Sequence, residues 1–189
     1  MKNKILIISL LLIVAFVGML TYKKSSMKQE SKQTAQELII QRDISEIRKF
    51  ADSSDLMVQY ESESKSSNGE NVPVSVYIAG ADRYEVNSAG KIIEFGSRNL
   101  PIGSENEKKY DNTPRYNFQE LEIMAKQFII KNALDANLDS LTSNHNNKGT
   151  NYFFRWEDRS QKTTEGYPFI QAGFTQGGTM TSYINTLTF

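Results

Sequence analysis

The feature that most constrains this 189-residue chain is an apolar run near its N-terminus. Residues 5–20 are apolar except for Ser9 and Gly18, and Thr21 and Tyr22 follow them. A helix of this length, rising about 1.5 Å per residue, spans roughly 24–27 Å, which is close to the apolar thickness of a bilayer. The run therefore predicts a transmembrane helix over residues 5–22, with residues 1–4 as a cytoplasmic tail.

The main alternative for this run is a cleaved secretory signal, with Lys2 and Lys4 as its basic end. Signal cores usually extend over about 7–15 residues and end at a small-x-small site, and neither property fits well here. A pilin-like leader would need a glycine before the run and a glutamate inside it, and a lipoprotein would need a cysteine, which the chain lacks. We expect an uncleaved anchor.

The orientation of the anchor depends on the lysines around it. Four lysines follow the run between residues 23 and 32, and this basic side alone would favour a cytoplasmic C-terminal body. A very short N-terminal tail is, however, the usual arrangement for export. We therefore expect a single-pass protein of a bacterial cytoplasmic membrane, with residues 23–33 as a linker and the C-terminal body on the outer face.

Charge and cysteine content exclude several classes of function. Of 22 basic and 22 acidic residues, six basic and one acidic lie in residues 1–32, which leaves 16 basic against 21 acidic in the rest. An acidic body argues against nucleic acid as a partner, because such binding depends on basic contacts to phosphate. The absence of cysteine removes disulfides, thiol catalysis and thiolate metal sites.

The first half of the body has the pattern of one helix followed by strands. Thr34 and Glu37 form a capping-box pattern, and apolar residues at helical spacing continue to Ala51. This pattern predicts an amphipathic helix that packs on a sheet, with a dimeric coiled-coil stalk as the alternative. Strands are expected over 56–63, 74–78, 83–86 and 91–95, the last two joined by a turn at Gly90.

The second half repeats this order. After an irregular polar segment over 99–116, Asn117 and Glu120 form a second capping-box pattern at the start of a helix. A polar loop is expected over 139–150. Strands are expected over 152–157, 168–175 and 179–186, with the last two joined by a turn at Gly177 and Gly178.

These elements predict an α+β fold of two consecutive modules, 34–98 and 117–189, separated by a linker over 99–116. In each module one helix would pack on an antiparallel meander. A 95-residue offset aligns Pro73 with Pro168, which is a weak sign of internal duplication.

Two stretches resemble PepSY-type modules, which occur in protease propeptides and in exported, membrane-anchored bacterial proteins. The stretch 84–92, with its aromatic strand and glycine turn, is similar to that family's closing hairpin. The C-terminal stretches 153–157, 168–171 and 182–185 are similar to it as well. The resemblance departs from the family in an imperfect first module and in the lack of a fourth strand in the second. It implies a non-catalytic role, such as regulating an envelope protease, and supplies no catalytic residues.

Tyr152, Phe154 and Trp156 are the candidate partner-binding residues, because they share one face of a predicted strand. Aromatic side chains on one face fit either a binding groove or a packed core, and the sequence leaves both open.

Other chemistry-bearing residues form no recognisable constellation. His145 is the only histidine and is expected in an exposed polar loop, and a lone histidine without cysteine makes a zinc site improbable. Glu157, Asp158 and Glu165 are the best carboxylate group, but neighbouring residues of a strand point to opposite faces. We therefore expect no catalytic residue, metal or cofactor.

The function expected from the sequence is that of a membrane-anchored, extracytoplasmic, non-enzymatic module. It would bind a protein or peptide partner and would regulate an envelope protease. The alternatives are an envelope hydrolase acting on glycans through the three carboxylates, and a structural subunit that assembles through the helix at 34–53. The oligomeric state is left open.

Overall fold

The computed structural model describes residues 34–68, 71–98, 108–164 and 166–187. The chain divides into two compact units, Met1–Arg42 and Asp43–Phe189. Of the first unit, residues 34–42 are described, and they are helical. The helix continues through residue 50, and its residues 43–50 belong to the second unit. The second unit also contains all the strands.

The predicted anchor over residues 5–22 lies outside the described residues. Within the described part of the chain, no helix has the length and apolar character that crossing a membrane requires. The prediction of a single-pass membrane protein with a transmembrane helix is corrected accordingly.

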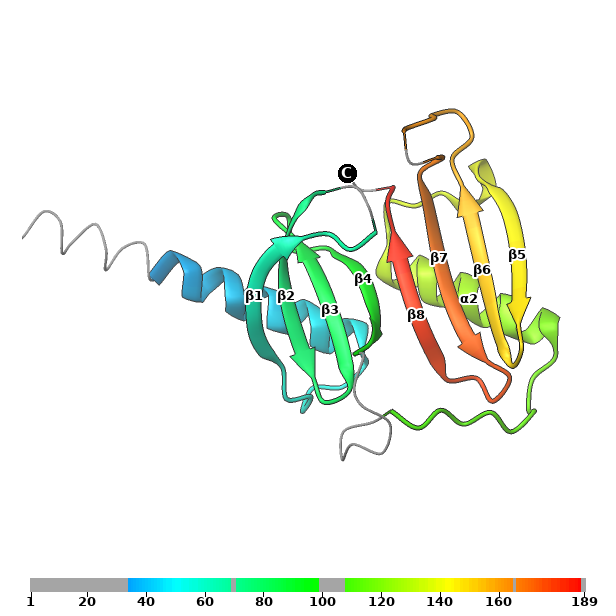
Figure 1. The fold of residues 1–189 in the computed structure, drawn as a ribbon, viewed down its shortest axis with the longest axis horizontal. Helices are drawn as coiled ribbons and strands as arrows, with labels where there is room; N and C mark the ends of the chain where they lie inside the picture. Colours follow the sequence, from blue (N-terminus) through cyan, green and yellow to red (C-terminus); the bar gives the residue numbers. More distant parts are fainter. Residues whose placement is uncertain (1–33, 69–70, 99–107, 165, 188–189) are drawn as a thin grey trace, which may run out of the picture. The chain divides into compact units, whose positions relative to one another are not determined.

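Eight antiparallel strands form one sheet in the order β1-β2-β3-β4-β8-β7-β6-β5 (Figure 1). The strands are β1 (Gln59–Lys65), β2 (Pro73–Ala79), β3 (Asp82–Asn87), β4 (Ile92–Ser97), β5 (Thr142–Lys148), β6 (Asn151–Glu157), β7 (Phe169–Thr175) and β8 (Met180–Asn185).

The fold class predicted from sequence, two consecutive PepSY-like modules after a transmembrane helix, is wrong. The first meander (β1–β4) and the second (β5–β8) join through β4 and β8, where Glu94, Phe95 and Gly96 pair with Ile184, Tyr183 and Ser182. Backbone donors and acceptors at a strand edge pair with any suitable edge. Local sequence patterns contain no signal for which two edges meet.

The predicted polar loop over 139–150 is also wrong for most of its length, because β5 occupies Thr142–Lys148. Its sequence has no apolar residue and therefore no alternation for a strand prediction to detect. β5 exists because each of its seven residues pairs with a residue of β6. The fourth strand that the second half was expected to lack is thus present.

Two helical segments pack on one face of this sheet. Residues 43–50 end the first helix, where Asp52 adopts a positive φ of 54° and Ser53 N donates to Arg48 O at 3.0 Å. α2 (Phe118–Asn132) contacts β6 and β7, and it begins with the predicted capping box between Asn117 and Glu120. A short 3₁₀ helix, η1 (Leu138–Ser140), follows α2.

The core under these helices follows one row of paired residues across the sheet. Phe50 belongs to neither meander, yet its ring lies 5.8 Å from that of Phe95, 5.2 Å from that of Tyr183 and 4.9 Å from that of Phe128 of α2. Both meanders and both helices therefore share a single core. The row, read by consecutive pairing, is Tyr77, Tyr84, Phe95, Tyr183, Ala172, Phe154 and His145.

One buried polar contact fixes the first helix on this core. Asp43 and Tyr77 are both fully buried, and the Tyr77 hydroxyl donates to Asp43 Oδ2 at 2.7 Å. Burial, together with this hydrogen bond and the Asp43 charge, raises the pKa of Tyr77, so the phenol stays protonated and donates.

The predicted hairpin turn at Gly177 and Gly178 is confirmed between β7 and β8, and its glycines also meet a tertiary requirement. A Cβ on Gly177 would lie 2.3 Å from the carbonyl oxygen of Asp111. A Cβ on Gly178, which has a φ of 84°, would lie 2.6 Å from the Tyr116 ring. The segment before α2 thus crosses this turn at a distance that only glycine permits.

Candidate functional site: a cavity between the helix ends

The candidate residues on β6 lie mostly in the core. Phe154 is 0% exposed and Trp156 is 2% exposed, and both face the helices. The Phe118 ring of α2 lies 5.3 Å from that of Phe154. Tyr152, on the same face of β6, is half-buried, and its ring centroid lies 6.3 Å from that of Phe118. The alternation along this strand was thus read correctly, and two of its three aromatic side chains pack in the core.

His145 lies in β5 and not in an exposed loop. It is half-buried, with its ring centroid 5.4 Å from that of Phe118 and 5.5 Å from that of Phe154. Its Nε2 lies 3.7 Å from Glu122 Oε1, while Nδ1 is buried and has no hydrogen-bond partner among the described residues. No cluster of three or more possible metal ligands occurs in the part of the chain that the structure describes.

The carboxylates considered for glycan hydrolysis are not gathered. Glu157 forms an ion pair with Arg159 at 3.3 Å. Asp158 accepts hydrogen bonds from Ser160 N at 2.9 Å and from Ser160 Oγ at 2.5 Å, which closes a local turn. Glu165 lies outside the described residues. A glycosidase needs two carboxyl groups that face each other across a cleft, and Glu157 and Asp158 are instead held by local partners.

A cavity of 740 Å³ lies where the two helical segments end on the sheet. The end of the first helix, the β3–β4 turn, the residues that follow α2 and the end of β8 all contribute to its wall. Its apolar lining consists of Phe50, Ile92, Ala133, Leu134, Ala136, Leu141 and Leu187. Phe50, Ile92 and Ala133 are buried, with exposed fractions of 7%, 9% and 9%, whereas Leu134 is 86% exposed at the rim.

The charges around this cavity are balanced and paired. Three lysines and three carboxylates line it. Lys91 forms an ion pair with Asp135, and Lys49 forms one with Glu46 at 2.7 Å. Lys131 pairs with Asp52 at 3.4 Å, and Asp158 is held by Ser160. Ions already paired in this way leave little unbalanced charge to fix a phosphate or another anion.

Sequence reasoning missed this cavity because its wall comes from segments far apart in the chain. The strongest local signal was Leu134, which continues the apolar pattern of α2 beyond the last helical residue. An apolar residue at that position fits either the core or a rim, and only the packing of α2 on the sheet decides which.

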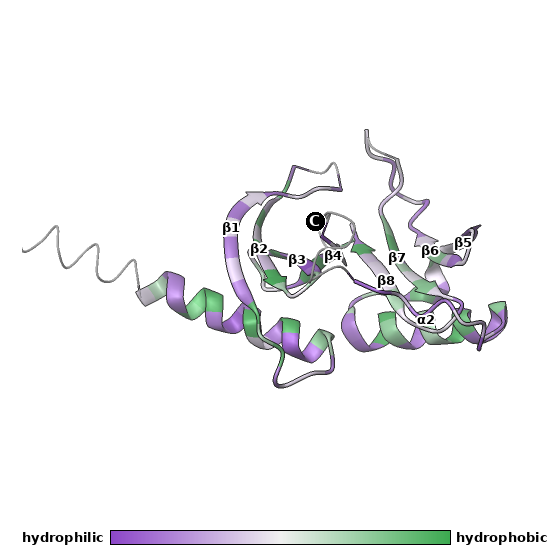
Figure 2. Cartoon of the chain, turned by 60° about the horizontal axis from the view of Figure 1, so that its bottom comes forward, coloured by the Kyte–Doolittle hydropathy of each residue, from purple (hydrophilic) through white to green (hydrophobic). Residues whose placement is uncertain are grey.

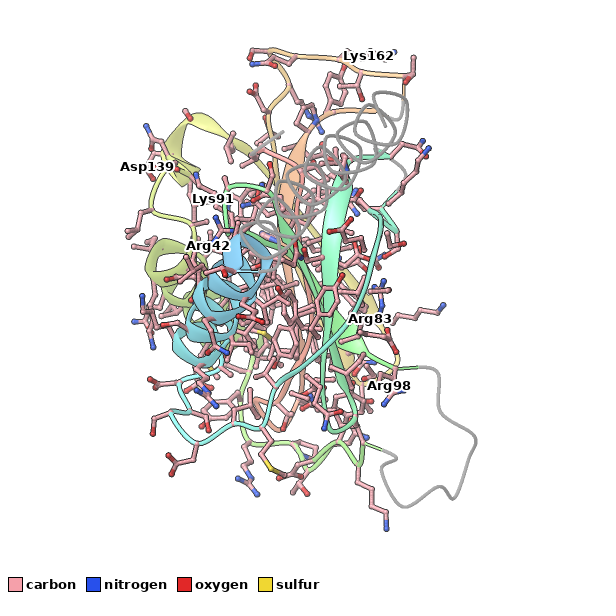
Figure 3. The ribbon with its side chains drawn as sticks, turned by 90° about the vertical axis from the view of Figure 1, so that its left-hand side faces the viewer. Arg42, Arg83, Lys91, Arg98, Asp139 and Lys162 are labelled. Atoms are coloured by element: carbon pink, nitrogen blue, oxygen red, sulfur yellow. The ribbon has the colours of Figure 1, made fainter. Side chains whose placement is uncertain are left out.

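Apart from the cavity, a polar cluster lies on the sheet face opposite the helices. Glu85 and Glu94 are directly paired residues on β3 and β4, and Glu85 is 0% exposed. The Glu85 carboxylate accepts from Ser67 Oγ at 2.6 Å and pairs with Arg83 at 2.5 Å. Arg83 and Lys91 belong to opposite ends of the β3–β4 hairpin, as Figure 3 shows, so this cluster is separate from the cavity.

Glu94 is the less well satisfied member of this cluster. Its Oε2 is buried without a hydrogen-bond partner among the described residues. Burial, and then the charge of Glu85, raises the pKa of Glu94 above the ordinary glutamate value. The folded protein therefore disfavours the ionised form of Glu94.

Glu94→Gln is expected to stabilise the protein at neutral pH. Because the pKa of Glu94 is higher in the folded than in the unfolded state, the protein is most stable with respect to this group below the unfolded-state pKa. That stability is lost as pH rises through the folded-state pKa. The gain appears as a higher melting temperature near pH 7, and in a domain of this size each 1 kcal/mol of stability corresponds to about 2–4 °C. It should shrink as pH falls toward about 4, where glutamate is largely protonated.

Melting curves of the parent and the variant across this pH range measure the effect. Glu63→Gln on the exposed strand β1 is the matched control and should give no such pH-dependent gain. If Glu94→Gln raised the melting temperature equally near pH 4 and near pH 7, the gain could not come from removal of the ionised Glu94 carboxylate.

Comparison of the sequence with protein-family models, with curated proteins and with solved structures finds no match. The resemblance to PepSY-type modules, and the protease-regulating role that it implies, stay predictions.

Proposed function

We propose that this chain is a non-enzymatic binding module that takes a peptide segment of a partner protein in the cavity between the helix ends. The observation that carries the proposal is the cavity itself. Its 740 Å³ falls in the range of about 300–1,000 Å³ that is typical of ligand sites, and its floor is apolar.

The lining favours an apolar anchor side chain as the occupant. Phe50, Ile92 and Ala133 form a floor without charge, and each lysine of the lining already forms an ion pair. An aliphatic or aromatic side chain gives up no hydrogen bond or charge on entering such a site, and it gains from the removal of its surface from water.

Two features of the rim favour a peptide over a small apolar molecule. Leu134 is 86% exposed beside the cavity and can cover a residue next to the anchor. α2 also ends at this rim, where Ala133 N donates to Ile129 O, and the carbonyl groups of the residues after Ile129 have no acceptor role inside a helix that ends at this point. Such acceptors can bind the backbone N–H groups of an extended peptide.

The test is selection of short random peptides, displayed on phage, against the full-length chain. We expect the selected peptides to share an aliphatic or aromatic residue. Binding of the synthesised peptides is then measured by fluorescence anisotropy against the parent and against Leu134→Glu. That variant should bind about tenfold or more weakly, because burial of a leucine side chain is worth about 1.5–3 kcal/mol.

Ile123→Glu is the matched control for this experiment. Ile123 is 54% exposed on α2, the helix that precedes Leu134, and does not line the cavity, so this variant should bind like the parent. Equal affinities of Leu134→Glu and the parent would contradict the proposed site, and a selection that enriches no peptide would contradict the proposed class of partner.

The structural-subunit alternative receives less support from the described residues. Ile47 was expected to contribute to an assembly surface on the helix at 34–53, but it is 0% exposed and lies in the core of the second unit. Ile44 is half-buried. A change of either residue to lysine would therefore be expected to disturb folding.

A further inference from the structure

Among the described residues, the sheet ends in β1 on one side and in β5 on the other, and these two edge strands differ in how well they are protected. β1 has a register shift between Tyr60 and Ser62, and it contains Glu61, Glu63 and Lys65. Bulges and charged side chains are the usual means by which proteins prevent an edge strand from pairing with another chain. In Figure 2, β1 ranges from purple to nearly white.

β5 has none of these protections over most of its length. It pairs with β6 in unbroken register, and it contains no proline, glycine or acidic residue. Six of its seven residues are exposed. Lys148, at the very end, is its only lysine, so a second strand could approach residues 142–147 without meeting a lysine or a carboxylate of β5.

The three central residues of β5 are symmetric, since Asn144 and Asn146 flank His145. Antiparallel pairing of two copies about a two-fold axis at His145 would place Asn144 opposite Asn146 of the second copy, on the same face. Each asparagine amide has both a donor and an acceptor, so the two side chains complement each other. Ser143 would face Asn147 in the same way.

We propose that β5 is a dimerisation edge, at which two copies of this chain pair antiparallel about His145 and continue the sheet from one protomer into the other. A two-fold interface uses the same patch on both partners, so the strand must be complementary to itself. In this register Lys148 faces Thr142 of the second copy, and no pair of like fixed charges meets along β5. This self-complementarity makes a second copy the occupant that β5 favours.

The interface would be small and the dimer weak. A contact made chiefly by one strand from each partner falls at the low end of interface sizes, below about 1,200 Å², which is typical of transient association. Dimerisation should therefore depend on protein concentration, and sedimentation velocity over a concentration series of the full-length chain is the appropriate measurement.

Paired charge variants test the register. In Asn144→Glu/Asn146→Glu, two pairs of like charges would face each other across the axis. The association constant of the dimer should therefore fall by about tenfold. In Asn144→Glu/Asn146→Lys, each glutamate would face a lysine, and dimerisation should be retained or strengthened. Both variants carry glutamate at 144, opposite Arg155 of β6, so the monomer tolerates them similarly.

Ser62→Glu/Ser64→Glu on the exposed strand β1 is the matched control, and it should dimerise like the parent. Equal behaviour of the two β5 variants would overturn the proposed register. A parent chain that stays monomeric at its highest soluble concentration would overturn the dimer.

Cysteine crosslinking gives a second test, since the chain has no cysteine of its own. Ser143→Cys mixed with Asn147→Cys should form a disulfide-linked dimer, because directly opposed residues have Cβ atoms about 4.5–5.5 Å apart. Ser143→Cys alone should form much less. Equal crosslinking with and without the partner variant would contradict the register. Neither test involves the cavity, so their failure is distinguishable from failure of the proposed peptide site.

Discussion

Phe50→Ala is expected to lower the free energy of unfolding by about 3–5 kcal/mol, the usual range for truncation of a buried phenylalanine. Phe50 is 7% exposed, and its ring contacts aromatic side chains of β3, β4, β8 and α2. The expected loss is a large part of the total stability of a typical domain, about 5–15 kcal/mol.

Urea denaturation followed by circular dichroism and by tryptophan fluorescence measures this loss. Trp156, the single tryptophan, lies in β6 and reports on the second meander. Because Phe50 connects the two meanders, the fluorescence midpoint should fall together with the circular dichroism midpoint. Met57→Ala is the control, since Met57 is 83% exposed and its truncation should change stability by less than about 0.5 kcal/mol. A fluorescence midpoint that Phe50→Ala leaves unchanged would show that the two meanders unfold independently, against the single shared core.

Trp156→Ala is expected to cost a similar amount, about 3–5 kcal/mol, because the indole is 2% exposed between the sheet and the helices. The loss arises from the removed apolar surface and from the cavity that remains. Thermal unfolding followed by circular dichroism measures it without the tryptophan signal.

Tyr152→Ala is the matched comparison for Trp156→Ala, because Tyr152 lies on the same face of β6 but is only half-buried. It should cost clearly less. If both variants instead kept the stability of the parent and lost binding of the selected peptides, the aromatic face of β6 would be a binding groove, and the assignment of Trp156 to the core would be wrong.

Elements with a strong local signal were predicted well. The capping box at Asn117, the hairpin turn at Gly90 and the strand that contains Val74 and Val76 are all present near their expected positions. In each case a few neighbouring residues determine the local structure, either through backbone hydrogen bonds or through alternation of apolar side chains.

β5 could not be predicted in the same way. Its side chains are polar throughout, and it is ordered by pairing with the aromatic strand β6. His145 was therefore assigned to an exposed loop, although its ring lies among those of Phe118, Phe154 and Trp156. The environment of this histidine depends on strand pairing and on the placement of α2.

The cavity was missed for a related reason. Phe50, Ile92 and Ala133 come from three separate segments, and each one alone fits an ordinary core position. They line a cavity because the two helical segments end at the same place on the sheet and leave space between them.

The sequence by itself determined the helices, the capping box at Asn117, most of the strands and the acidic, cysteine-free character of the body, because these properties depend on residues close together in the chain. Only the tertiary structure decided that β4 pairs with β8, that both meanders share one core around Phe50, and that the aromatic side chains Phe154 and Trp156 are buried. The physical reason is that unpaired strand edges and apolar faces are chemically alike. Which of them meet is decided by the packing of the whole unit.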